Sequence, residues 1–555
     1  MGAVAGKWQR NLLRYFSLLG TWSILLLPTA SSPAIPLDAR AQAETVAARP
    51  TAAPPLQLPT AVHVHSTAST GRLDLDSLSL LARDQGVEAV VLSENLVLRI
   101  RYAPWPLHYF FELQRQLPSL SVYGIRRHLR EIAAAQERHP EVLLLPGVEV
   151  MPYVYWTGSP IGGDLTLHDM QRNVLVIPPI ATLESRSADE AQIATGDRFL
   201  VSSRDTGTFF DSMPAIGNPG AESYGWGSLL LFLPGFILAL AGSVRLATNA
   251  AADAPRSDSE RKGLLRGHGS RLRAFLLLGL GIGLLVSNFP YTEPVIRAYD
   301  PAASLLPYQR LSGYVRGGGG LVFWSMPEAV DDRRLQVGPI PVRLLTNPYP
   351  QALVTTEGYT GVGGVYADTV TILEPGALWD RLLLAYCRRE RPRPPWMIGE
   401  SAFHFSGQAG KHLGDVLTVL LVEEKSRAAA YEALGHGHSY ALRKNSAGDL
   451  RLGEFTLGAR QGGKVAWPGD TLELAGGDRF ELTVQIISKG DEEVPVHVEV
   501  IRQGLAHLSW NDVTPFRRQL TESLAPGEGT VYYRLDVEGP RPLHIASNPI
   551  FVRRR

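Results

Sequence analysis

The sequence predicts an α/β domain that is interrupted by a pair of membrane-spanning helices and followed by an all-β sandwich. Strand-like and helical runs alternate over residues 60–222 and again over 293–447, which is typical of βα units. Two apolar segments without charged residues separate these stretches, and each is long enough to cross a bilayer. From residue 448 the pattern changes to short strands separated by Gly, Asp and Pro turns, as in immunoglobulin-like sandwiches.

The chain begins with a basic and then apolar segment, which is typical of export signals. Lys7, Arg10 and Arg14 precede the apolar run at 15–28, and small residues at 41–43 offer a cleavage site. Residues 1–43 are therefore expected to be either a signal peptide or an uncleaved N-terminal anchor, with a linker at 44–59. Both alternatives place the rest of the chain in the export pathway.

The first part of the α/β domain, residues 60–222, contains the strand-like runs "AVHVH", "EAVVLSE", "EVLLLPGVEV" and "NVLVIPP". Helical runs such as "DLDSLSLLARDQG" and "YGIRRHLREIAAAQERH" lie between them. The second part, residues 293–447, continues the alternation with "LVFWS" and "LWDRLLLAYCRRER". A parallel sheet or barrel divided by the apolar segments is the simplest arrangement.

The apolar segments, residues 223–244 and 274–292, are expected to form a transmembrane hairpin over 223–292. Gly279 and Gly283 have the spacing that lets membrane helices pack closely. The loop 245–273 carries seven basic residues against three acidic ones, so the positive-inside rule makes it cytoplasmic. We therefore expect a multi-pass protein of the inner or plasma membrane, whose partner is the lipid bilayer and whose soluble parts share the exported, periplasmic side.

Composition narrows the function further. Lys and Arg number 54 and Asp and Glu number 54, so the chain lacks the basic excess of a nucleic-acid-binding protein, and no nucleic-acid partner is expected. Cys387 is the single cysteine, which excludes intramolecular disulfides and zinc sites built from several thiolates.

Two histidines one residue apart, His63 and His65, occur in the first strand. Strand periodicity places their imidazoles on one face while Val64 faces the other way. Together with Gly147 and Glu149 in "LLLPGVEV" and His404 in "IGESAFHF", the order of motifs resembles the PHP (polymerase and histidinol phosphatase) family. The resemblance implies an irregular (β/α)7 barrel, metal-dependent phosphoesterase chemistry, and metal ligands at four positions: His63, His65, Glu149 and His404.

Other positions depart from the family pattern. Of nine ligand positions that the resemblance implies, four remain. The other five carry Thr70, Asn95, Asn173, Met326 and Ala402, and His168 could replace Asn173 only in a shifted register. Methionine and alanine cannot replace imidazole or carboxylate as ligands of hard or borderline ions. A trinuclear cluster is therefore not expected, whereas one divalent ion (zinc, manganese or iron) on His63, His65 and Glu149 fits a known catalytic arrangement.

Three interpretations of the remaining residues stay open: a metal-free polar cluster satisfied by Glu149 and backbone groups, a mononuclear metal site, or a pocket for a phosphate or other anion. Glu94 is either an acid at the barrel mouth or a hydrogen-bond partner of His63 or His65. Donors lost from separate motifs favour a non-catalytic or strongly altered relative that binds a ligand, either a small anion or a protein. The alternative is an active mononuclear metal-dependent phosphoesterase or hydrolase. In each case the four residues named by the resemblance are expected to converge.

The C-terminal residues, 448–555, are expected to form a separate antiparallel β-sandwich of roughly immunoglobulin size. Nothing in this stretch suggests chemistry.

Overall fold

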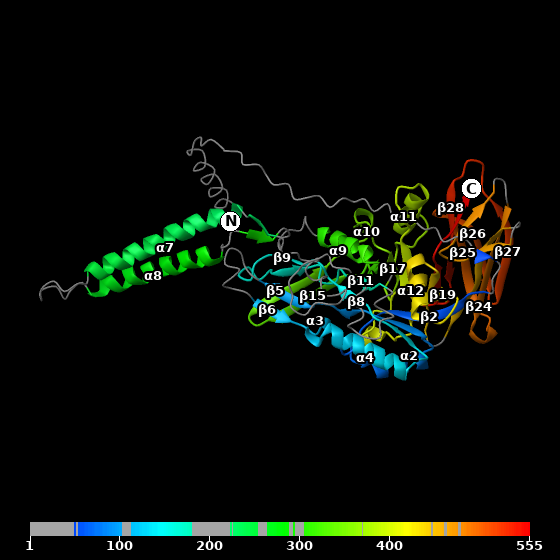
Figure 1. Cartoon of the computed structure of the whole chain (residues 1–555), viewed down its shortest axis with the longest axis horizontal. Coiled ribbons are helices and arrows are strands. Elements are labelled where there is room, and N and C mark those ends of the chain that lie inside the picture. The colour runs from blue at the N-terminus through cyan, green and yellow to red at the C-terminus, as the bar shows by residue number, and fades with distance from the viewer. Residues whose placement is uncertain are drawn as a thin grey trace. The chain divides into compact units, whose positions relative to one another are not determined.

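The computed structural model describes residues 49–50, 54–102, 113–179, 222–224, 226–252, 264–287, 292–294, 305–368, 370–445, 448–459, 463–475 and 479–554 (Figure 1). The expected export signal or anchor at 1–43 and most of the expected cytoplasmic loop lie outside these residues. The rest is a mixed α/β structure with a β-rich C-terminal region, as the sequence predicts.

Two sheets carry the strands expected from the βα pattern. One has the strand order β18-β17-β14-β11-β8-β4, and the other contains the run β20-β19-β2-β3-β7. The strands are β2 (Leu56–Val64), β3 (Ala89–Leu92), β4 (Glu94–Asn95), β7 (Leu143–Leu145), β8 (Val148–Val150), β11 (Val174–Ile177), β14 (Leu321–Trp324), β17 (Gly361–Val365), β18 (Trp396–Gly399), β19 (Val416–Val422) and β20 (Ser439–Arg443).

The two sheets are joined at two places, where β3 and β7 lead into β4 and β8, and where the chain leaves β18. β4 follows β3 after one residue, and β8 follows β7 after Pro146 and Gly147. At the second place, Ser401 N donates to Val62 O and Phe403 N to His63 O, both at 2.9 Å, so the chain leaving β18 runs beside β2. The backbone pairings thus bring the ends of β2, β4, β8 and β18 to one place.

One strand departs from the expected parallel arrangement. β11 pairs antiparallel with both β8 and β14, whereas β17 is parallel to β14 and to β18. Parallel neighbours need a long crossover connection, usually a helix. The short strands β9 (Tyr155–Thr157) and β10 (Thr166–His168) take the place of that helix between β8 and β11, so the direction reverses there.

A buried apolar cluster lies at the centre of these strands. Each of six strands contributes to it, through Val62, Val91, Leu145, Leu175, Phe323 and Ile398. Tyr431 and Leu434 of α12 (Arg427–His436) pack into the same cluster. His63 in β2, and Glu400 directly after β18, are therefore attached to strands whose other side chains are fixed by a common core.

Helices begin and end where capping residues require it. Asp74 caps α2 (Leu75–Asp84) by accepting a hydrogen bond from Ser77 N, and Ser426 caps α12 in the same way. Gly437, in the left-handed region at φ 72°, ends α12. The other helices outside the apolar pair are α3 (Leu120–Tyr123), α4 (Ile125–Arg138), α9 (Leu306–Gly317), α10 (Ala352–Thr355) and α11 (Leu378–Cys387).

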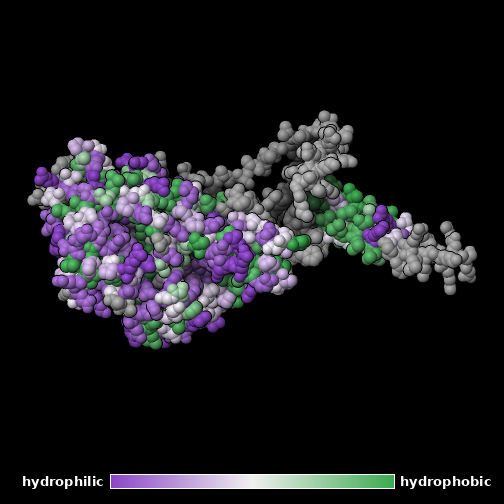
Figure 2. Space-filling view, turned by 180° about the vertical axis from the view of Figure 1, so that it is seen from behind, coloured by the Kyte–Doolittle hydropathy of each residue, from purple (hydrophilic) through white to green (hydrophobic). Residues whose placement is uncertain are grey.

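Two long helices, α7 (Trp226–Ala252) and α8 (Leu264–Ser287), correspond to the expected hairpin. Among the described helices, only the Leu230–Ala250 segment of α7 is long and apolar enough to span a membrane by length and composition. Exposed apolar side chains cover both helices (Figure 2), among them Leu233, Phe236, Phe275 and Leu276. One expectation needs correction, because space around Gly279 is open, whereas a Cβ on Gly281 would lie 2.2 Å from Ala239 N of α7. Gly281, rather than Gly279, therefore permits a close approach of α8 to α7.

The C-terminal strands form two layers. One sheet has the order β1-β22-β21-β24-β27, and the other joins β23, β30, β28 and β29, with β25 and β26 beside β28. The bounds are β1 (Arg49–Pro50), β21 (Leu450–Ala459), β22 (Lys464–Ala466), β23 (Thr471–Leu474), β24 (Arg479–Ser488), β25 (Pro495–Arg502), β26 (Leu505–Val513), β27 (Phe516–Ser523), β28 (Thr530–Glu538), β29 (His544–Ser547) and β30 (Ile550–Arg554). β29 pairs with β20, so one sheet continues across the expected boundary at residue 448.

Short strands complete the described structure. β15 (Asp331–Val337) and β16 (Ile340–Thr346) form a sheet with β10 and β9, while β5 (Arg99–Tyr102) pairs with β6 (Leu113–Gln116) and β12 (Glu222–Tyr224) with β13 (Thr292–Pro294).

Candidate metal centre

The two histidines of the first motif lie at the end of β2, but not on a regular strand. The pairing of β2 with β3 shifts between Val62 and Val64, and His63 between them has φ 69°, in the left-handed region that non-glycine residues seldom adopt. The imidazoles still face each other, with ring centroids 5.3 Å apart. A bulge, rather than simple alternation, therefore aims His63, and such strained residues cluster at functional sites.

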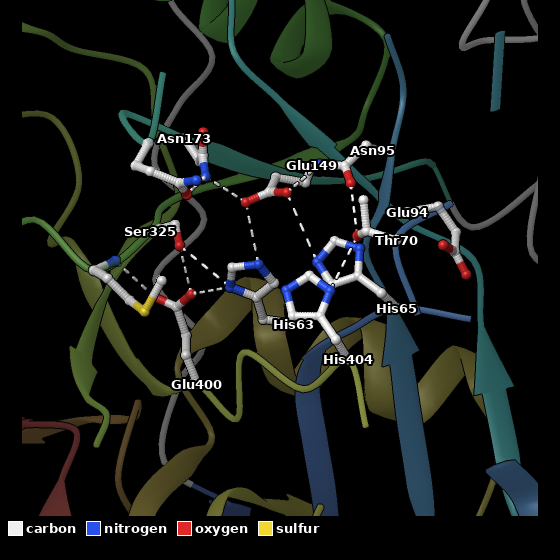
Figure 3. A network of polar contacts seen from close by, with 12 residues as sticks. His63, His65, Thr70, Glu94, Asn95, Glu149, Asn173, Ser325, Glu400 and His404 are labelled. Carbon is white, nitrogen blue, oxygen red and sulfur yellow. Dashed lines mark hydrogen bonds and ion pairs between the residues drawn. The ribbon is translucent and has the colours of Figure 1, made fainter. Parts of the chain in front are cut away.

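The structure brings the four residues named by the resemblance together (Figure 3). Glu149, in β8, places Oε1 3.2 Å from His63 Nε2 and Oε2 3.7 Å from His65 Nε2. Ligand atoms of His63, His65 and Glu149 all lie within 4.8 Å of one another. The ring of His404 stacks on that of His65, with centroids 4.2 Å apart and planes 4° from parallel.

A buried carboxylate that the sequence analysis did not identify fixes His63. Glu400, directly after β18, is fully buried, and its Oε2 lies 2.8 Å from His63 Nδ1. An ionised carboxylate can only accept hydrogen bonds. His63 Nδ1 therefore donates to Glu400, and the other ring nitrogen, Nε2, faces Glu149.

His65 is held by a relay rather than by a carboxylate directly. Its Nδ1 lies 3.3 Å from Ser69 Oγ, and that hydroxyl donates its proton to Glu94 Oε2. Glu94 also accepts from Ser66 N at 2.8 Å and from the Ser66 hydroxyl at 2.5 Å. Glu94 therefore acts on His65 through Ser69, which corrects the expectation of direct contact with an imidazole.

The same pattern extends to His404. Thr70 Oγ1 donates to Asn95 Oδ1 at 3.0 Å and lies 3.0 Å from His404 Nδ1. A hydroxyl has one proton to give, so His404 Nδ1 must be the donor to Thr70. In all three histidines Nδ1 thus carries a proton and is occupied, and Nε2 faces the opposite side, which for His63 is the side of Glu149.

The two oxygens of Glu149 are occupied in part by amides. Asn173 Nδ2 donates to Oε1 and Asn95 Nδ2 donates to Oε2. Both asparagines stand where the resemblance implies histidine ligands. His168, the expected substitute for Asn173, instead hydrogen-bonds Thr157 and stacks on Tyr155, so the shifted register does not occur.

Burial and nearby charges shift the pKa values of the site in opposite directions. Burial lowers the pKa of His63, but Glu149 and then Glu400 outweigh it and raise it to about 10. Burial raises the pKa of Glu149, but His63, followed by His65 and His404, lowers it to about 2. Burial lowers the pKa of His404 to about 4 and that of His65 well below its usual 6.5. Burial also raises the pKa of Glu94 to about 7, despite hydrogen bonds from Ser66 and Ser69.

These donors fit one divalent ion. His65 Nε2 is buried and, within the part of the chain that the structure describes, has no hydrogen-bond partner, an arrangement that costs free energy unless a cation or other group completes it. Two imidazole nitrogens and one carboxylate are a donor set that zinc, manganese and iron accept. The groups that hold each Nδ1 are the supporting shell that such histidines normally have.

The sequence offered a partial signal for the supporting residues. Glu400 lies two residues before Ala402 in "IGESAFHF", directly after a strand, where a carboxylate is placed at the same end as His63. Ser69 and Thr70 belong to the turn after the first motif. Their roles follow only from side-chain directions, which periodicity does not give at a bulge or a turn.

No protein-family model matches the chain, and no curated protein matches it. Solved structures are similar, among them a two-domain protein from Bacteroides vulgatus described as containing a PHP-like metal-dependent phosphoesterase, with a TM-score of 0.32 and 11% identity over 89% of this chain and 93% of that one. A Bifidobacterium adolescentis protein named as a metal-dependent phosphoesterase has a TM-score of 0.26 and 14% identity over 65% of this chain and 93% of that one. An amidohydrolase from Chromobacterium violaceum, with bound sulfate and no metal, has a TM-score of 0.24 and 15% identity over 64% of this chain and 90% of that one. Such low similarity carries no argument about chemistry, which rests on the contacts above.

Proposed function

We propose that this protein is a membrane-anchored hydrolase of phosphoric esters with one divalent metal ion, built on an irregular PHP-type barrel. The observation that carries the proposal is the common orientation of three imidazoles. Each Nδ1 donates to a different oxygen, on Glu400, Ser69 or Thr70. This leaves His63 Nε2 and the partnerless His65 Nε2 beside Glu149 as ligands.

A divalent ion bound there would polarise a phosphoryl oxygen and lower the pKa of a bound water to near neutrality. The chain itself supplies orientation. Glu149 is ionised at neutral pH, since its pKa is about 2, and the stacked His404 is neutral, since its pKa is about 4. His404, less buried than His65, carries its proton on Nδ1, so its Nε2 would complete the ligand set rather than donate to a phosphate.

One ion is favoured over three by the contacts of Glu149. In a cluster, both oxygens of this carboxylate would bridge metal ions, but here the amides of Asn95 and Asn173 hydrogen-bond to them. Met326 and Ala402 provide no ligand atom at two further positions.

The same amides favour a second candidate function, a non-catalytic relative that binds a small anion or a protein. The amides of Asn95 and Asn173 donate to the two oxygens of Glu149 and so hold the cluster together, although it has fewer metal ligands than the resemblance implies. In this case a bound metal ion would have no hydrolytic role.

The test is metal analysis of the purified full chain together with hydrolysis of generic phosphomonoesters and phosphodiesters. The hydrolase proposal expects about one metal ion per chain and activity that is lost on chelation and in Glu149→Gln. One metal ion without hydrolysis of either ester would favour the non-catalytic candidate. Protein that binds neither zinc nor manganese would refute the metal centre in both.

We also propose that α7 and α8 span the membrane, with residues 60–222 and 293–555 on the exported side. The exposed apolar side chains of both helices support lipid contact. Cysteine substitution in the loop 253–263 and at exposed Glu424, in a Cys387→Ser background, tests the topology. We expect a membrane-impermeant maleimide to label the Glu424→Cys variant in spheroplasts. The cysteine in the loop 253–263 should be protected from labelling. The reverse pattern would refute the orientation.

A further inference from the structure

Both oxygens of the Glu400 carboxylate accept hydrogen bonds from other residues of the protein. Its Oε2 accepts from His63 Nδ1 at 2.8 Å and from Ser325 Oγ at 2.7 Å, and its Oε1 accepts from Met326 N at 3.1 Å. The residue is fully buried. Because both oxygens are occupied, and because they lie on the Nδ1 side of His63 rather than on the Nε2 side, Glu400 is not placed as a metal ligand.

The backbone around Glu400 is shaped to receive it. A Cβ on Gly363, in β17, would lie 1.4 Å from Glu400 Oε1 and 2.4 Å from its Cδ, so only glycine leaves room for the carboxylate. Pairing of β17 with β18 is irregular at this same glycine. Met326, at φ 37°, directs its backbone N–H at Glu400 from a conformation that L-residues seldom adopt.

The departures from the expected ligand pattern coincide with this arrangement. Met326 stands where the resemblance implies a histidine, and its backbone N–H now binds Glu400. Ala402 stands where it implies an aspartate, and the carboxylate nearby in sequence is that of Glu400. Both departures therefore lie beside Glu400, one through the backbone N–H of Met326 and the other two residues along the chain.

We propose that Glu400 is a positioning residue that holds the Nδ1–H of His63 in a hydrogen bond and so presents Nε2 to the metal ion, and that Gly363 is required because its missing side chain is the space Glu400 occupies. The inference rests on the proposed metal centre for its effect on metal affinity. The hydrogen bond from His63 Nδ1 to Glu400 and the close approach of Gly363 are properties of the chain itself, and can be tested without metal.

The first measurement is zinc affinity of the purified full chain, by competition with a chromophoric chelator. Glu400→Gln is expected to weaken zinc binding about 10–100-fold, the usual effect of losing a supporting partner, while one ion per chain still binds at saturation. The matched control is Glu424→Gln, at an exposed glutamate, which should leave the affinity unchanged. Unchanged affinity in Glu400→Gln, or loss of all zinc binding in a folded variant, would overturn the positioning role, the second because it would make Glu400 a ligand.

Gly363→Ala tests the space directly, with Gly313→Ala as control because a Cβ there meets nothing within 4 Å. Gly363→Ala should weaken zinc binding at least as much as Glu400→Gln. In a Glu400→Ala background the same substitution should add little, because the space is already vacant, so the two effects are non-additive. If the losses in zinc affinity multiply, the alanine acts elsewhere and the requirement for Gly363 is wrong.

A metal-free readout separates this inference from the metal centre. In protein labelled with ¹⁵N-histidine, we expect a slowly exchanging imidazole N–H resonance that disappears in His63→Gln and is shifted or lost in Glu400→Gln, but not in Glu424→Gln. If the wild-type chain binds no zinc yet shows this pattern, the proposed metal centre fails and the assignment of the hydrogen bond from His63 Nδ1 to Glu400 stands. If it binds zinc but lacks the resonance, the inference fails and the metal centre stands.

Discussion

Two buried charged clusters in this protein differ in how completely they satisfy themselves. At the junction of α11 and β28, Arg534 and Asp380 are both fully buried and form a two-point ion pair, Nε to Oδ1 and Nη2 to Oδ2, each at 2.7 Å. Tyr532 OH and Gly376 N also donate to Asp380. The carboxylate therefore has no capacity left for a ligand, and the one atom of the ion pair that has no hydrogen-bond partner among the described residues, Arg534 Nη1, is a donor that cannot bind a cation.

The cluster around Glu149 has comparable burial but is incomplete. Each Nδ1 is paired, yet His65 Nε2 has no hydrogen-bond partner among the described residues, and its distance of 3.7 Å from Glu149 is too long for a hydrogen bond. Strained backbone occurs at His63, Met326 and Ala402. The difference indicates that the first cluster stabilises the fold, whereas the second retains an atom for binding at some cost to stability.

Breaking the first cluster should give the largest effect. Asp380→Ala leaves the Arg534 guanidinium buried without its carboxylate, which is expected to lower the free energy of unfolding by about 3–5 kcal/mol. Urea unfolding of the full chain in detergent measures it. The double substitution Asp380→Leu with Arg534→Met should cost less than the single one, and zinc stoichiometry should not change in either. A destabilisation below about 1 kcal/mol in the single variant would contradict the comparison.

The second cluster should respond in binding rather than in stability. His65→Phe preserves the stacked ring against His404 but removes both nitrogens, so zinc affinity should fall at least about 100-fold. Among the described residues, the one side-chain hydrogen bond lost is the 3.3 Å contact with Ser69, so metal-free stability should change by about 1 kcal/mol or less. Titration with zinc and urea unfolding check the two halves. A variant that is severely destabilised but binds zinc normally would reverse the assignment of the two clusters.

A third, smaller effect is expected where the C-terminal strands touch the strand that leads to Glu400. Asn548 is fully buried and bonds Met397 N at 2.8 Å, Met397 O at 3.0 Å and Ser439 Oγ at 2.9 Å, and so occupies the open edge of β18. Asn548→Ala should cost about 1–3 kcal/mol of stability, because it leaves these backbone groups unpaired.

The matched control for that variant is Asn511→Ala, at an exposed residue of β26, with an expected change within about 0.5 kcal/mol. Because β18 carries Glu400 at its end, zinc binding should also weaken in Asn548→Ala. Stability equal to that of the control would show that Asn548 does not brace β18.

The sequence predicted the elements of the site better than their connections. Alternation of strands and helices predicted the mixed α/β structure, and motif order identified the four residues that meet at Glu149. The sequence did not predict that β11 is antiparallel to β8, because strand direction depends on whether a connection crosses the sheet. It also did not predict the sheet shared by β20 and β29. The roles of Glu400 and Gly363 were not predicted. The Glu400 side chain occupies the space where a side chain at position 363, 37 residues earlier, would lie, and sequence periodicity gives no information about such a contact.

A rise in pH should have opposite effects on two properties of the site, the stability of the metal-free chain and its zinc affinity. In the metal-free chain the pKa of His63 is about 10, above the unfolded value of 6.5, so His63 stabilises the fold fully below pH 6.5 and loses that contribution as the pH rises towards 10. Metal binding must displace the Nε2 proton, so zinc affinity should instead rise, by up to about tenfold per pH unit. Zinc competition and urea unfolding between pH 7 and 9 test both slopes, in a range where Glu94, with its pKa of about 7, has largely titrated. A zinc affinity that does not change over this range, or a metal-free chain that becomes more stable, would show that His63 is not the proton-carrying ligand.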